Sequence, residues 1–74
     1  MTGKNWPSSK AAIVYRALLR IGWAPKPGRK GSSHVQLFHS EYGEYTWAFH
    51  DSVEIGPVML KKIAKHTGLK PEDL

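Results

Sequence analysis

The sequence contains no cysteine among its 74 residues, which excludes a disulfide framework and every metal site built from thiolates. It has no apolar run approaching the ~20 residues needed to cross a membrane, and residues 1–6 lack the apolar core of a secretory signal. We therefore expect a soluble cytoplasmic protein without a membrane partner. The short chain leaves no room for a cofactor-binding domain beside a core, so enzymes built on nucleotide-binding folds are excluded.

Acidic residues are absent from the first half of the chain, because the first one is Glu41. Seven cations precede it, namely Lys4, Lys10, Arg16, Arg20, Lys26, Arg29 and Lys30. The chain has a net charge of +5, and this half of it is strongly electropositive. Such a region suits a polyanion such as nucleic acid. A charged surface that keeps a small protein soluble explains the same balance, so charge alone does not decide the function.

Hydrophobic periodicity predicts a helix that ends near Ile21. Apolar residues recur at helical spacing from Val14 onward. Ser8 or Ser9 is suited to cap its first turn, and Gly22 is suited to follow its last one.

A second amphipathic helix is predicted over residues 58–66. Pro57 is suited to its first position, and Gly68 is suited to close it. We expect its apolar stripe to consist of Met59, Leu60, Ile63 and Ala64. We expect Lys61, Lys62 and Lys65 on its solvent side.

Between the two helices, alternating polarity predicts a β-hairpin over residues 33–39 and 45–50, with a turn at 40–44 that contains Gly43. If His39 pairs with Tyr45, then His34 lies opposite His50 on the face away from the apolar side chains. A register shifted by two residues still leaves both histidines on that face. Residues 24–33 contain two prolines, so any strand there is a short edge strand within a basic loop.

These elements predict an α+β fold in which two helices pack on one face of a small antiparallel sheet. The predicted order is helix, short strand, strand, strand, helix. Residues 1–8 form a flexible lead-in, and residues 9–74 form a single domain.

The histidines are the candidates for chemistry, and each has a structural alternative. His39 belongs to the apolar face and is expected to be a packing residue, whereas His66 suits the negative end of the last helix. His34 and His50 are expected beside the basic loop. A metal site there lacks a third ligand, because Asp51 points to the other face of a regular strand. We expect no metal and no cofactor.

Histidine beside cations is instead suited to cleavage of RNA, whose own 2′-hydroxyl is the nucleophile. One imidazole transfers the proton, and cations stabilise the charge of the transition state. His34 and His50 are both candidates for this imidazole. The expected phosphate contacts are Lys26, Arg29, Lys30, Ser32 and Ser33.

Short motifs follow one another along the chain, and their order and spacing are more specific than any one of them. They are Gly22-Trp23, Lys30-Gly31-Ser32-Ser33-His34, Phe38-His39-Ser40, Ala48-Phe49-His50, Glu54-Ile55-Gly56-Pro57, Leu60-Lys61-Lys62-Ile63 and Thr67-Gly68-Leu69. Over residues 9–74 this series resembles the HicA family of mRNA interferase toxins.

The resemblance implies a fold similar to the double-stranded-RNA-binding domain, with two helices on one side of a three-stranded antiparallel sheet. It implies a ribosome-independent ribonuclease that cuts mRNA and is neutralised by a HicB antitoxin covering the active site. The family's catalytic histidine, in a Gly-Ser-His motif at the start of a strand, corresponds to His34. The resemblance thus assigns His34 as the general acid or base, with His50 as a candidate second group, which alternatively only contacts the antitoxin. An alternative alignment keeps Gly31-Ser32 in the motif and places Ser33 at the histidine position.

The sequence departs from the family pattern at Ser32, where glycine is preferred, and at Ala48, where proline is usual. Val58 also replaces a glycine at the start of the last helix. Two alternatives therefore stay open beside the toxin. One is a non-catalytic RNA-binding module of the same fold, and the other is a toxin-like domain that only associates with a partner. Phe38, Trp6 and Tyr42 are candidates for a partner surface.

Overall fold

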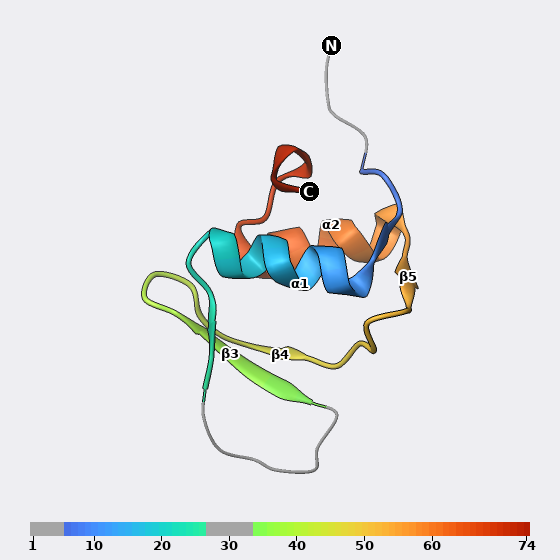
Figure 1. Ribbon diagram of the computed structural model, residues 1–74. Coiled ribbons are helices and arrows are strands. Elements are labelled where there is room, and N and C mark those ends of the chain that lie inside the picture. The colour runs from blue at the N-terminus through green and yellow to red at the C-terminus, as the bar shows by residue number, and fades with distance from the viewer. Residues whose placement is uncertain (1–5, 27–33) are drawn as a thin grey trace.

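The computed structural model describes residues 6–26 and 34–74. Residues 1–5 of the predicted lead-in and residues 27–33 of the predicted basic loop lie outside the described residues. The elements, in chain order, are β1 (Ser9–Lys10), α1 (Ala11–Arg20), β2 (Ala24–Pro25), β3 (Val35–His39), β4 (Gly43–Trp47), β5 (Glu54–Ile55), α2 (Pro57–Thr67) and a 3-10 turn (Pro71–Asp73) (Figure 1).

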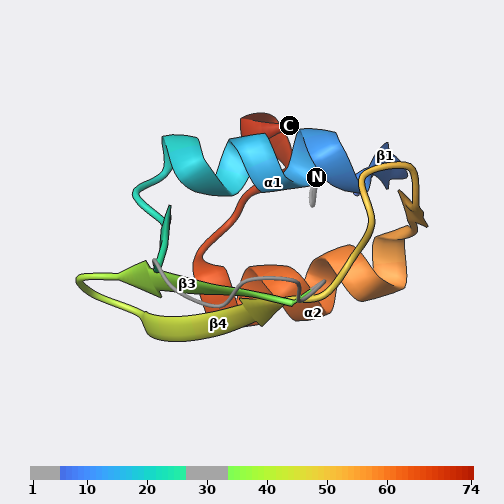
Figure 2. The same cartoon turned by 60° about the horizontal axis from the view of Figure 1, so that its bottom comes forward.

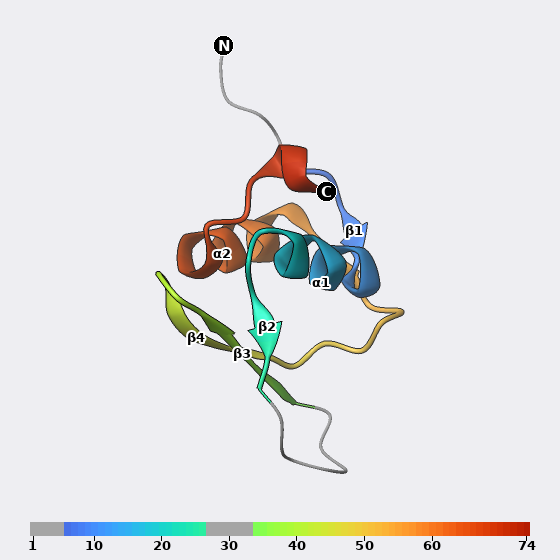
Figure 3. The ribbon, with the colours of Figure 1, turned by 60° about the vertical axis from the view of Figure 1, so that its left-hand side comes forward.

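The predicted α+β architecture is confirmed. Strands β2, β3 and β4 form a three-stranded antiparallel sheet. These strands follow α1 and precede α2 in the sequence, so the order along the chain is α-β-β-β-α. This arrangement is consistent with a fold like that of the double-stranded-RNA-binding domain. Both helices lie on the same side of β3 and β4 (Figures 1 and 3). No helix in the described ranges is long and apolar enough to span a bilayer.

The core lies between the helices and the sheet (Figure 2). Its buried apolar side chains come from both helices, from β3, β4 and β5, and from the segments that follow each helix. They are Ala11, Val14, Ala17, Leu18, Trp23, Leu37, Trp47, Ile55, Leu60, Ile63 and Leu69. Each fully buried aliphatic side chain contributes about 1.5–3 kcal/mol to folding.

The start of α1 differs from the prediction. Neither Ser8 nor Ser9 caps the helix, because Ser9–Lys10 forms β1, which pairs with β5. The first helical N–H groups bond instead to the chain between β4 and β5. Ala11 donates to the carbonyl of Val53 at 2.8 Å, and Ala12 donates to that of Asp51 at 3.2 Å. Backbone carbonyls thus satisfy donors that a side-chain cap otherwise serves.

The ends of α1 and α2 agree with the sequence. Gly22 follows the last turn of α1 with φ +113°, and Gly68 closes α2 with φ +78°. The prediction that Met59 belongs to the buried apolar stripe of α2 is wrong, because this side chain is 39% exposed. The buried residues of this helix are Leu60, Ile63 and Thr67, and the predicted solvent-side lysines are exposed.

The hairpin forms, but its predicted register is wrong by two residues. His39 pairs with Gly43 rather than with Tyr45, and Val35 pairs with Trp47. The turn is shorter than expected, because Gly43 adopts a φ of +91° and enters β4 directly after Tyr42. A shift of two keeps every side chain on its predicted face.

The edge strand predicted within the proline-containing segment is confirmed. β2 has only two residues, and it pairs with Leu37 and Phe38 of β3 (Figure 3). Pro25 is tolerated because it lies at the edge of the sheet, where its missing N–H removes no bond from a central strand. This strand brings Lys26 to the sheet.

Candidate active site

The predicted site residues fall into two groups. Arg29, Lys30, Ser32 and Ser33 lie outside the described residues. His34, Lys26 and His50 are described and exposed. His34 directly precedes β3, and Lys26 directly follows β2.

The expected pairing of His34 with His50 is wrong. In the observed register the ladder ends at Val35 and Trp47, and its continuation sets His34 opposite Ala48. His50 lies beyond the end of β4, where the chain is no longer extended as a strand. The two histidines therefore do not face each other across the sheet.

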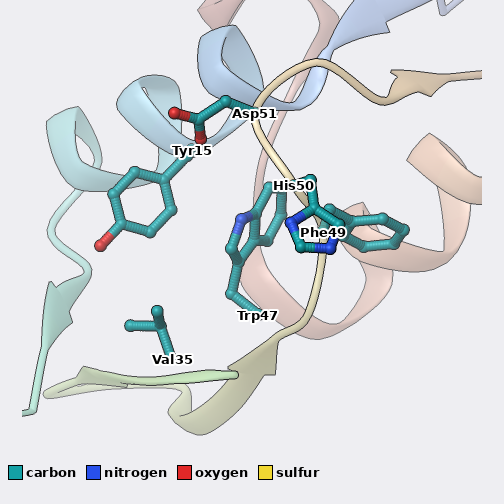
Figure 4. A pocket seen from close by; sticks show the side chains of 6 residues that line it. All are labelled: Tyr15, Val35, Trp47, Phe49, His50 and Asp51. Atoms are coloured by element: carbon teal, nitrogen blue, oxygen red, sulfur yellow. The ribbon is translucent and has the colours of Figure 1, made fainter. Parts of the chain in front are cut away.

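His50 instead lines an open hollow of about 340 Å³ between α1 and the sheet. Its lining residues, shown in Figure 4, are Tyr15, Val35, Trp47, Phe49, His50 and Asp51. The ring centroids of Tyr15 and Trp47 are 5.7 Å apart, and those of Trp47 and Phe49 are 5.1 Å apart. The hollow thus has aromatic walls and a polar rim.

Asp51 lies in this hollow beside His50, contrary to the expectation that it points away. That expectation assumed a regular strand through position 51, but β4 ends at Trp47. A turn follows, in which the N–H of Val53 donates to the carbonyl of His50 at 3.0 Å. No group of three His, Cys, Asp or Glu side chains able to hold a metal ion occurs in the described ranges.

A polar network crosses the open face of the three-stranded sheet. Lys26 Nζ donates to Glu44 Oε2 at 2.8 Å. Gln36 Nε2 donates to Glu44 Oε1 at 3.2 Å, and the hydroxyl of Thr46 donates to Gln36 Oε1 at 3.0 Å. The hydrogen bond from Lys26 and its positive charge hold the pKa of the Glu44 carboxyl below its ordinary value. Lys26, a predicted phosphate contact, is therefore partnered by a carboxylate.

His39 is a packing residue, as predicted. It is 8% exposed, and its ring lies 5.2 Å from that of Trp23, centroid to centroid. Its Nδ1 accepts the N–H of Glu41 at 3.0 Å, so the ring proton lies on Nε2, which donates to the carbonyl of Ile21 at 3.1 Å. Both ring nitrogens are thus used within the fold.

His66 lies in the last turn of α2, as predicted. Its ring stacks on that of Tyr45 at 6.0 Å, with an interplanar angle of 22°. Partial burial raises the pKa of the Tyr45 phenol. His66 therefore belongs to the packing between α2 and β4.

The candidates for a partner surface differ in exposure. Phe38 is 47% exposed and Tyr42 is 51% exposed. Trp6 is partly buried and packs against the core. Val58, which is 72% exposed at the start of α2, is a further candidate for this surface that the sequence pattern did not indicate.

Sequence reasoning also missed the aromatic hollow. Trp47 and Phe49 alternate with polar residues in the sequence, and Tyr15 lies in the first predicted helix. Their alternation does indicate a shared face, but it does not reveal that this face is incompletely covered near the end of β4. The only local sign of the hollow in the sequence is the pair His50-Asp51, two polar residues at the end of the predicted strand.

Comparison with known proteins gives one match. Residues 12–69 match the family model described as the HicA toxin of bacterial toxin-antitoxin systems. No curated protein and no solved structure matches the chain significantly.

Proposed function

The chain belongs to the HicA toxin family of bacterial toxin-antitoxin systems, and we propose that it is a metal-independent endoribonuclease that cleaves mRNA with His34 as its proton-transfer group. Toxins of this family are mRNA interferases, and they pair with antitoxins. Its substrate would place it in the cytoplasm.

The position of His34 carries this proposal. It is exposed at the start of β3, where the cation-rich segment 26–33 joins the sheet. An imidazole at this position can take the proton of an RNA 2′-hydroxyl or return one to the leaving oxygen. His39 cannot replace it, because His39 is buried and both of its ring nitrogens are bonded.

Cations and hydroxyls near His34 would stabilise the charge that develops on the reacting phosphate. We assign Arg29, Lys30 and Lys26 as phosphate contacts, and Ser32 and Ser33 as donors to the phosphate oxygens. Lys26 would have to exchange its bond to Glu44 for one to phosphate. No cofactor enters this mechanism.

His50 is a candidate for a second role in the reaction. Its ring lies on the rim of the hollow rather than opposite His34. A second proton-transfer group would have to reach the same phosphodiester from the end of β4. The alternative is that His50 contacts only the bound RNA or the antitoxin.

The expected protein partner is a HicB-type antitoxin that covers the site around His34. Phe38 lies on β3, the strand that follows His34, and it is exposed, so it would supply an apolar contact for the antitoxin on this strand. Occlusion of His34 would then account for neutralisation.

The test is cleavage of a single-stranded RNA by the wild type and by His34→Ala, with EDTA present. We expect His34→Ala to reduce the rate by about 10²–10⁴-fold, with an unchanged circular dichroism spectrum. His66→Ala is the matched control, because it removes another exposed imidazole and should keep the activity. A DNA strand of the same sequence should not be cleaved, because it lacks the 2′-hydroxyl.

Full activity of His34→Ala would overturn the assignment, and loss of wild-type activity in EDTA would indicate a metal. The second candidate function is a non-catalytic RNA-binding module, which the exposed Lys61, Lys62 and Lys65 of α2 favour. Such a module would cleave no RNA and would bind duplex RNA with a strong dependence on salt, whether or not His34 is present.

A further inference from the structure

We propose that the hollow lined by Tyr15, Phe49 and Asp51 binds one base of the RNA substrate and selects guanine. This inference rests on the proposed ribonuclease function, since it names a base of the RNA that the enzyme would cleave. It concerns a surface that is separate from the polar network of Lys26 and Glu44.

The shape and lining of the hollow suit a flat aromatic ligand. Its volume of about 340 Å³ is open to solvent on one side, which leaves the ribose and phosphate outside. Tyr15 and Phe49 are only partly buried, and the ring of each packs against that of the buried Trp47. Unstacked RNA bases bind proteins by stacking on such rings, but stacking alone accepts any base.

Asp51 supplies the selection. Its backbone is held in place, because its carbonyl accepts the N–H of Ala12 from α1. Its exposed carboxylate has no hydrogen-bond or ion-pair partner among the residues described. A carboxylate repels phosphate, so the part of the RNA that binds here is a base and not the backbone.

The chemistry of a carboxylate favours guanine over the other bases. An ionised aspartate only accepts hydrogen bonds, through two oxygens. The Watson–Crick edge of guanine presents two adjacent N–H donors, N1–H and the N2 amino group, which match that pair of oxygens. Adenine and cytosine present one amino group beside an acceptor nitrogen, which the carboxylate repels.

The hollow lies at the same end of the sheet as the proposed catalytic residue. Val35 forms part of its lining, and it directly follows His34 in the chain, so their Cα atoms are about 3.8 Å apart. Successive side chains of a strand point to opposite faces, so the side chain of His34 lies across β3 from the hollow. An RNA strand that passes around this end of the sheet would place one base in the hollow and, a short way along the strand, the bond that His34 would attack.

The first test measures base binding without cleavage. Guanosine, inosine and adenosine 5′-monophosphates share the same phosphate and ribose, so differences between them report on the base. We expect GMP to shift the NMR signals of the Tyr15 and Trp47 rings at concentrations about tenfold lower than IMP, which lacks the N2 amino group. AMP should bind more weakly than GMP.

Asp51→Asn is the matched variant, because it keeps the size of the side chain and removes the paired acceptors. It should abolish the preference for GMP over IMP, whereas Glu41→Gln, which removes a carboxylate from the turn at the other end of the hairpin, should retain it. Equal binding of the three nucleotides by the wild type would overturn the proposal. Ring signals that move with a partner protein but with none of the nucleotides would also overturn it.

The second test separates this inference from the proposed function. With RNA oligonucleotides that differ at one position near the cleaved bond, the wild type should cleave those with guanosine there fastest, and Asp51→Asn should cleave with little base preference while keeping its activity. Cleavage without any such difference would refute the guanine site and leave the ribonuclease standing. GMP selectivity in a protein that cleaves no RNA would refute the ribonuclease and leave the guanine site standing.

Discussion

The ammonium of Lys26 lies 2.8 Å from Oε2 of Glu44, so a cation at the end of the edge strand β2 is bonded to a carboxylate on β4. Gln36 of β3 donates to the other oxygen of the same carboxylate. The contact therefore spans all three strands of the sheet. It also offsets part of the positive charge that the RNA backbone would meet near His34.

Removal of the Glu44 carboxylate should strengthen RNA binding. In Glu44→Gln the charge of Lys26 is no longer offset, so it can neutralise one more phosphate. We expect tighter binding of single-stranded RNA, and a plot of log affinity against log salt that is steeper by about 0.7. Glu41→Gln removes an equal charge outside this network and should change the slope less. The His34→Ala background allows the measurement without cleavage, and an unchanged slope would exclude Lys26 as a phosphate contact.

The same ion pair should be lost in acid. Because the pKa of Glu44 is lowered by Lys26, the contact contributes fully above the ordinary value of 4.5 and is lost as the pH falls through the lowered pKa. Carboxyl NMR titration should show Glu44 ionising below pH 4.5, and Lys26→Met should raise that midpoint. A midpoint that stays constant in Lys26→Met would show that the pair does not persist in solution.

His50→Ala tests the second role proposed for that residue. Because His50 does not face His34 across the sheet, we expect kcat to fall by less than about tenfold, compared with about 10²–10⁴-fold for loss of a proton-transfer group. An increase in KM is expected from the altered rim of the hollow. A fall in kcat as large as that of His34→Ala would make His50 a second catalytic residue.

Gly22→Ala should destabilise the fold through its contact with His39. A Cβ at position 22 would lie 2.8 Å from Nε2 of His39, and the backbone there has a φ of +113°. We expect a loss of about 1–3 kcal/mol in the free energy of unfolding. Gly43→Ala is the control, because its φ of +91° is unfavourable but no atom lies within 4 Å of the added Cβ. Urea unfolding should show a smaller loss in the free energy of unfolding for Gly43→Ala. Equal losses in the two variants would show that the contact with His39 does not contribute.

The sequence determined those features that depend on neighbouring residues. Alternation in β3 set which side chains face the core, since successive residues of a strand point to opposite sides. Pro57 and Gly68 marked the ends of α2, because one restricts φ and the other tolerates a positive φ. The exposure of His34 at the start of β3 follows from the same alternation.

Only the tertiary structure decided the register of the hairpin, the start of α1 and the place of Asp51. The turn at Gly43 selected one of two registers with the same side-chain faces, and so separated His34 from His50. The first N–H groups of α1 bond to carbonyls some 40 positions away, which no local pattern can indicate. Those bonds hold the chain after β4 out of the sheet. His50 and Asp51 therefore line the same hollow, whereas in a regular strand their side chains would point to opposite faces.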